Sequence, residues 1–182
     1  MKKLLGVAAM LLFAASVSHA QSNTGSSTLS VTVGAEAAIV VATTPPFSSV
    51  GIFGNYTATT PFTYYVRTTS GGAGGAVTVE ITTDFSPGGP GGGPSVTAPP
   101  TTGDLLTYAC TVANAGGVGT PTACTGPMTA STAAATNVLT FAPGTQSAKT
   151  GGSGSTSWTL VNDPVYKAGT YSAVATYTIS AA

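Results

Sequence analysis

Apolar and polar residues alternate along several segments of this 182-residue chain, a pattern typical of β-strands with one buried face. The clearest segment is residues 170–180. Its polar face carries Ser172, Thr176 and Thr178, with Val174 as the exception. Its apolar face consists of Tyr171, Ala173, Ala175, Tyr177 and Ile179. The pattern predicts a half-buried strand over these residues.

The same alternation recurs over residues 62–68 and 77–83, which a Gly-rich connection joins. Two such segments in succession predict a β-hairpin with a long, flexible turn. Segments of similar character predict further strands at residues 29–33, 37–42, 105–112, 138–141 and 157–161. About eight short strands separated by turn residues predict an all-β fold, an antiparallel β-sandwich.

A Gly/Pro-rich stretch at residues 86–103 interrupts this pattern. Residues 86–100 carry few large side chains, so we expect this stretch to contribute nothing to the core. It is either a linker between two small domains or a long surface loop. Because each flank alone would bury little apolar surface, we favour a loop within a single domain over residues 21–182.

The first twenty residues have the character of an export signal. Lys2 and Lys3 precede an apolar run at residues 4–17, and small residues lead to a cleavage point after Ala20. The run is shorter than the roughly 20 residues of a membrane-spanning helix. We therefore expect a cleaved signal peptide and no transmembrane segment afterwards. The protein would then be secreted, periplasmic or held at the cell surface.

Charged residues make up only 5% of the chain. Without the leader, Arg67, Lys149 and Lys167 are the basic residues that remain, and the single histidine, His19, is lost. Three scattered cations cannot form a basic patch, and we therefore expect no binding to nucleic acid. A catalytic triad would lack its base. We therefore expect no enzyme, no cofactor and no metal site.

Two carboxylates could still support glycoside hydrolysis without a histidine. Glu80 and Asp84 share one face of a predicted strand, where four residues separate them by roughly 13 Å. Glycosidases hold their carboxylates about 5 to 9.5 Å apart. We therefore expect Glu80 and Asp84 to be solvated charges on a strand face.

Cys110 and Cys124 are the only cysteines. In an exported chain, such a pair predicts a disulfide. The ring would enclose a loop-like segment of about 15 residues, for which chain entropy predicts roughly 3 kcal/mol of stabilisation. A metal or redox site is less favoured, because the spacing is not C-x-x-C and no histidine is available.

Residues 166–179, in which Gly169-Thr170-Tyr171 lead into an alternating Thr/Val strand, resemble the C-terminal strand of secreted bacterial fimbrial subunits and spore-coat-U-like proteins. The resemblance to these chaperone-usher-type pilins covers a small part of the chain. It implies an incomplete immunoglobulin-like sandwich, completed by the N-terminal extension of the next subunit.

Under this resemblance, the alternating Leu29, Val31 and Val33 are a candidate donor strand. An in-chain first strand would show the same alternation, so both interpretations stay open. The candidate acceptor strand carries Tyr171, Ala173, Ala175, Tyr177 and Ile179. The implied function is a structural surface protein, a pilus-like or biofilm-matrix subunit in cell adhesion, whose partners are further copies or other surface subunits.

Exposed aromatic side chains would indicate a different role. Tyr64 and Tyr65 are adjacent, so in a regular strand one of them faces outward, although the alternation does not tell which. With Trp158 they are candidates for stacking against sugar rings, but aromatic residues in β-rich proteins more often pack in the core. The alternative function is therefore a monomeric extracellular module that binds a glycan or a protein.

Overall fold

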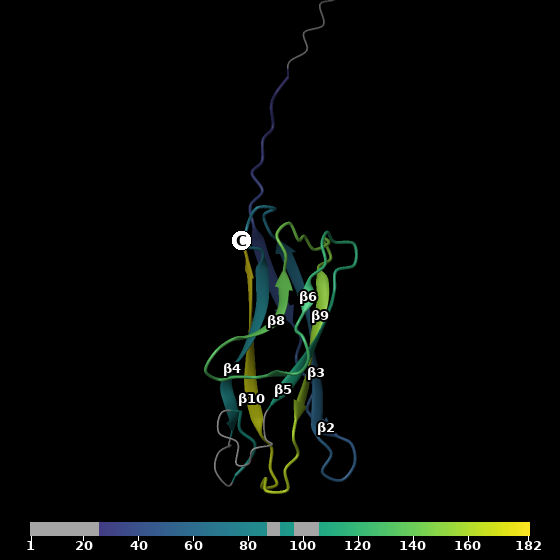
Figure 1. Ribbon diagram of the computed structural model, residues 1–182, viewed down its shortest axis with the longest axis vertical. Helices are drawn as coiled ribbons and strands as arrows, with labels where there is room; N and C mark the ends of the chain where they lie inside the picture. The colour runs from purple at the N-terminus through teal and green to yellow at the C-terminus, as the bar shows by residue number, and fades with distance from the viewer. Residues whose placement is uncertain (1–25, 87–91, 97–105) are drawn as a thin grey trace, which may run out of the picture. The chain divides into compact units, whose positions relative to one another are not determined.

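The computed structural model describes residues 26–86, 92–96 and 106–182. All regular secondary structure in this part of the chain is β-strand, so the all-β prediction is confirmed (Figure 1). The chain divides into two units, Met1–Thr32 and Val33–Ala182, and all of the described strands belong to the second unit.

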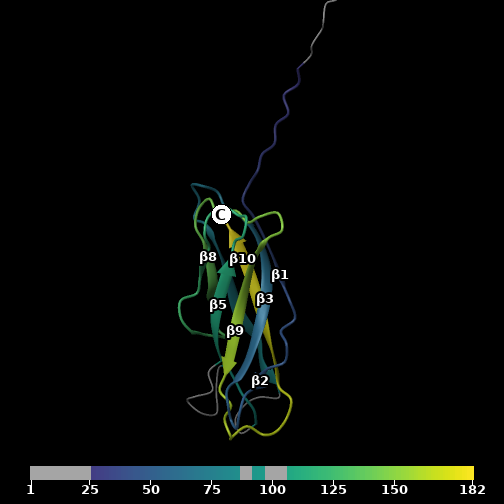
Figure 2. The ribbon, with the colours of Figure 1, turned by 90° about the vertical axis from the view of Figure 1, so that its right-hand side faces the viewer.

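The strands of the second unit form two antiparallel sheets, one of which curls into a half-barrel (Figures 1 and 2). The first sheet has the order β1 (Glu36–Val41), β3 (Tyr56–Arg67), β9 (Gly152–Leu160), β5 (Thr107–Ala113) and β7 (Met128–Thr129), and β2 (Ser48–Ser49) also pairs with β3. The second sheet has the order β10 (Ser172–Ala181), β4 (Gly75–Ser86), β8 (Thr136–Phe141) and β6 (Thr122–Ala123).

The predicted hairpin over residues 62–83 is wrong. Its two strands, β3 and β4, lie in different sheets, and the Gly-rich connection carries the chain from one sheet to the other. Alternation specifies which face of a strand is buried, but it does not specify the neighbouring strand. The crossing is tight at Gly74, which has a φ of 84°, and an added Cβ there would lie 2.1 Å from the carbonyl oxygen of Phe141.

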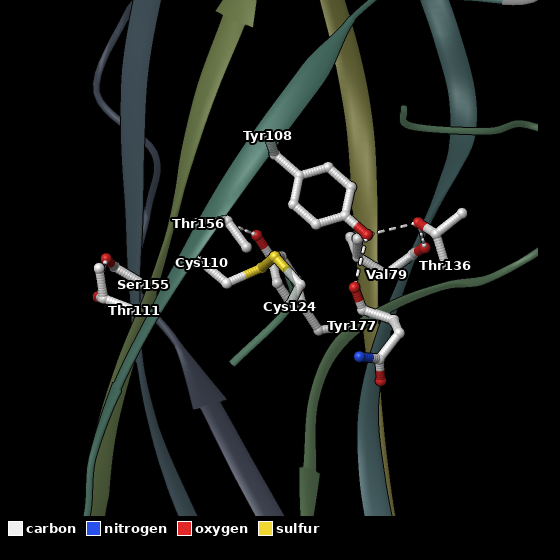
Figure 3. Close-up of a disulfide and its surroundings, with 10 residues drawn as sticks. Val79, Tyr108, Cys110, Thr111, Cys124, Thr136, Ser155, Thr156 and Tyr177 are labelled. Atoms are coloured by element: carbon white, nitrogen blue, oxygen red, sulfur yellow. Dashed lines mark hydrogen bonds between the residues drawn. A yellow bond between two sulfur atoms is a disulfide. The ribbon is translucent and has the colours of Figure 1, made fainter. Parts of the chain in front are cut away.

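The core lies between the sheets and is built from the alternating positions that the sequence marks. Tyr64, Tyr108 and Trp158 are almost fully buried, and the rings of Tyr108 and Trp158 have centroids 5.2 Å apart. The Tyr108 hydroxyl donates to Thr136 Oγ1 and to the Asn137 carbonyl, at 2.7 and 2.9 Å (Figure 3). Buried aromatic residues therefore fill the interior while their polar atoms remain hydrogen-bonded.

The predicted disulfide between Cys110 and Cys124 is confirmed, and it connects the two sheets (Figure 3). Cys110 belongs to β5 of the first sheet. Cys124 directly follows β6 of the second sheet, and its amide donates to the Val138 carbonyl at 2.9 Å. The bond therefore closes a short loop in sequence while it joins separate layers of the fold.

The expectation that the Gly/Pro-rich stretch contributes nothing to the core is also wrong. Val96 is 5% exposed and belongs to the core. It is held there by Asp84, whose carboxylate accepts hydrogen bonds from the amides of Phe85 and Val96 and from the Ser95 hydroxyl, at 2.8, 2.8 and 2.7 Å. Asp84 is thus an anchor rather than a solvated charge. Residues 87–91 and 97–103 of the stretch, like the expected signal peptide, lie outside the described residues.

Candidate functional site

Both sheets end on the same side of the fold, in the strands β1 and β10. Among the described strands, β1 pairs with β3 alone and β10 pairs with β4 alone. The two edge strands lie close to each other (Figure 2), but no strand pairing joins them. Each therefore presents one row of backbone donors and acceptors that no described strand pairs with.

The inward faces of these two strands are only half covered. In β10, the predicted apolar face packs against the core, but its side chains are less buried than those of the adjoining β4. The same holds for Ala37 and Ile39 of β1, which are also half-buried and touch the core. The half-buried residues at β10 are those expected of an acceptor strand: Tyr171, Ala173, Ala175, Tyr177 and Ile179.

A cavity of about 220 Å³ opens beside β10. The short side chains of Ala173 and Ala175 form one wall, because they leave space that larger residues would fill. The lining also includes Val41 at the end of β1 and, from the following loop, Ala42 and Phe47. These edges and this cavity together form what we call the β1–β10 groove.

The floor of the groove contains polar side chains that are hydrogen-bonded to one another. The Trp158 indole N–H donates to Thr60 Oγ1 at 2.8 Å, and the hydroxyl oxygens of Thr60 and Thr44 lie 2.5 Å apart. The hydroxyls of Tyr177 and Thr156 are also hydrogen-bonded to each other (Figure 3). With these atoms paired to each other, the groove suits apolar side chains and an added backbone better than it suits acid–base chemistry.

Burial raises the pKa of Tyr177, and it also raises the pKa values of Tyr64 and Tyr108 in the core. Burial favours the neutral form of tyrosine, so each raised pKa contributes stability that is fully present below pH 10.0, the pKa of tyrosine in the unfolded chain. That contribution is lost as the pH rises above 10.0, because the unfolded chain then loses the proton more easily than the folded protein does. We therefore expect the free energy of unfolding, measured in urea, to fall as the pH rises above about 10. Tyr177→Phe should flatten this fall, and an equally steep fall in that variant would contradict the assignment.

The expected donor residues are exposed. Leu29, Val31 and Val33 are 95%, 85% and 59% exposed, and the structure describes no strand over residues 26–35. The sequence predicts a strand at residues 29–33, and the structure assigns none there. Donation to another copy stays a prediction.

The aromatic residues expected to bind sugar are largely inaccessible. Tyr64 and Trp158 are 0% and 3% exposed, so both belong to the core. Tyr65 is the outward member of the adjacent pair, with 39% exposure. The contribution of Phe47 to the groove was not expected from the sequence, because Phe47 lies in a loop, where no periodicity marks the buried positions.

No protein-family model, no curated protein and no solved structure matches this chain. The site is therefore interpreted from its own residues and geometry. In the described part of the chain, no helix is long and apolar enough to cross a membrane.

Proposed function

We propose that this chain is a secreted structural subunit, fimbria-like or part of a biofilm matrix, which assembles by β-strand pairing between copies. In this proposal the two sheets form an incomplete immunoglobulin-like sandwich. The segment with Leu29, Val31 and Val33 of one copy fills the β1–β10 groove of the next. The disulfide is compatible with an oxidising compartment such as the periplasm or the exterior.

The observation that carries this proposal is the match between an incompletely covered groove and an exposed alternating segment. The groove has two strand edges, and half-buried apolar side chains lie along both of them. The segment has apolar residues at every second position and is not paired in the structure. A strand added at the free edges of β1 and β10 would pair with backbone groups and bury its apolar face, which is the usual basis of β-augmentation.

The composition of the edges also supports strand addition. Natural proteins usually protect an exposed edge with charged residues or proline. β10 contains neither, and β1 has a single charged residue, Glu36, which is paired with Arg67 at 2.9 Å. A bulge interrupts β10 only near its start, between Ser172 and Ala175. Most of this edge is therefore available to another strand.

The proposal predicts multimers that depend on the apolar positions of the donor segment. On a denaturant-free gel and in size-exclusion chromatography, the purified protein should form a ladder of multimers. The triple variant Leu29→Ser, Val31→Ser, Val33→Ser should run as a monomer, because it removes the apolar face. The matched control, Ser30→Ala with Thr32→Ala, alters the other face and should keep the ladder. A folded wild-type protein that is only monomeric would refute the proposal.

A further inference from the structure

The loop between β2 and β3 exposes large apolar side chains at the end of the fold opposite Ala182 (Figure 1). Val50 is 89% exposed, Ile52 is 94% exposed and Phe53 is 58% exposed. The chain has no charged residue between Glu36 and Arg67, so the whole loop is uncharged. A cluster of this kind is typical of a binding surface for an apolar partner.

The backbone holds these side chains in a defined, strained turn. Gly51 has a φ of 85°, and Phe53, although it is not glycine, has a φ of 51°. Gly54 cannot be replaced easily, since an added Cβ would lie 2.0 Å from the carbonyl oxygen of Val50. Strain of this type persists where the surrounding structure imposes it, and it is concentrated at functional sites.

A cavity of about 440 Å³ adjoins this turn and shares Phe53 with it. Its volume lies within the range of about 300–1,000 Å³ that is usual for small-molecule sites. Several aromatic rings line it, from segments that are far apart in the sequence. These residues are Phe47, Phe53, Tyr56, Phe85, Tyr166 and Tyr171.

The cavity also has one acidic and one basic residue in its lining, Asp163 and Lys167. The Asp163 carboxylate is positioned by the hydrogen bond that it accepts from the Val165 amide at 2.8 Å. The Lys167 backbone is fixed at both ends, because its amide donates to the Gly92 carbonyl at 2.8 Å and its carbonyl accepts from the Tyr171 hydroxyl at 2.7 Å. Aromatic rings with a carboxylate suit a quaternary ammonium, and an ammonium group suits a phosphate.

We propose that this end of the protein binds a phosphatidylcholine surface. The choline group lies among the aromatic rings near Asp163, the phosphate lies near Lys167, and Val50 and Ile52 enter the acyl region. Phosphocholine is the shared chemistry of a free ligand and a lipid headgroup. The exposed apolar side chains beside the cavity favour the lipid, since burying them in hydrocarbon adds to the binding free energy. This inference does not depend on the proposed strand pairing.

The test is cosedimentation of the purified protein with vesicles of palmitoyl-oleoyl phosphatidylcholine. We expect binding that soluble phosphocholine reduces and that Ile52→Ser weakens on the order of tenfold, because that change removes an aliphatic side chain that the bilayer would bury. The matched control, Val118→Ser, changes a side chain that is 59% exposed elsewhere in the fold and should bind like wild type. Asp163→Asn and Lys167→Gln should each weaken binding while they leave the unfolding midpoint unchanged.

Three outcomes would overturn the inference. The first is an absence of binding to phosphatidylcholine vesicles, and the second is binding that Ile52→Ser does not weaken. The third is equal binding to phosphatidylglycerol vesicles, which would show that the headgroup pocket has no role. If the first outcome came with binding of free phosphocholine, it would assign the cavity to a soluble ligand and would still refute the membrane proposal.

Discussion

Replacing Ala175 by Asp is expected to prevent a subunit from accepting the donor segment of another copy. Ala175 lines the cavity of the β1–β10 groove and is half-buried in the unassembled protein, so the fold can tolerate a polar side chain there. A donated strand would cover this position and bury an unpaired carboxylate, which costs several kcal/mol. Size-exclusion chromatography of purified Ala175→Asp should therefore show a monomer with unchanged circular dichroism.

A matched control lies next to it on the same strand. Val174 is on the outward face of β10 and is 52% exposed, so Val174→Asp adds the same charge outside the groove. This variant should assemble like the wild type. If both variants assembled equally, or if both failed, the groove would not be the acceptor site.

Mixing variants separates the two roles of each copy. A subunit with Ala175→Asp keeps its donor segment, and the triple serine variant at Leu29, Val31 and Val33 keeps its groove. Each should be a monomer alone, but together they should form a 1:1 dimer, because each supplies what the other lacks. Analytical ultracentrifugation of the mixture measures this. A mixture that stays monomeric would refute pairing between these two surfaces.

The sequence predicts the strands of this fold better than it predicts their neighbours. The alternation in β10, with Ala173, Ala175 and Tyr177 inward and Val174 outward, agrees with the structure, because burial of one face imposes a period of two. The same rule could not show that β3 and β4 lie in different sheets. Pairing depends on the whole arrangement of strands, which no local pattern contains.

Buried positions outside regular strands were harder to predict. Val96 enters the core from a Gly/Pro-rich stretch because Asp84 accepts hydrogen bonds from its amide and its neighbours. Phe47 contributes to the groove from a loop. Alternation also left Tyr64 and Tyr65 equivalent, since it identifies two faces without telling which one is covered. In each case the missing information is a tertiary contact.

Removing the disulfide with Cys110→Ala and Cys124→Ala is expected to lower the free energy of unfolding by about 3 kcal/mol. The two cysteines are separated by 14 positions in the sequence, and the bond closes the loop between them. Its loss therefore increases the entropy of the unfolded chain. The folded state also loses its covalent link between β5 and the residue after β6. β6 is a two-residue strand and has few hydrogen bonds of its own. Urea unfolding at neutral pH measures the loss, and reduction of the wild type should give a loss of the same size.

The disulfide and the groove involve different edges of the fold, and this allows a sharper test. The disulfide closes the side on which the sheets end in the two-residue strands β7 and β6, whereas β1 and β10 leave the other side open. Below the urea concentrations that unfold it, the double alanine variant should therefore form multimers to the same extent as the wild type. Loss of multimers in a variant that remains folded would show that the two edges are coupled. It would also show that the groove depends on how tightly the opposite side holds the sheets together.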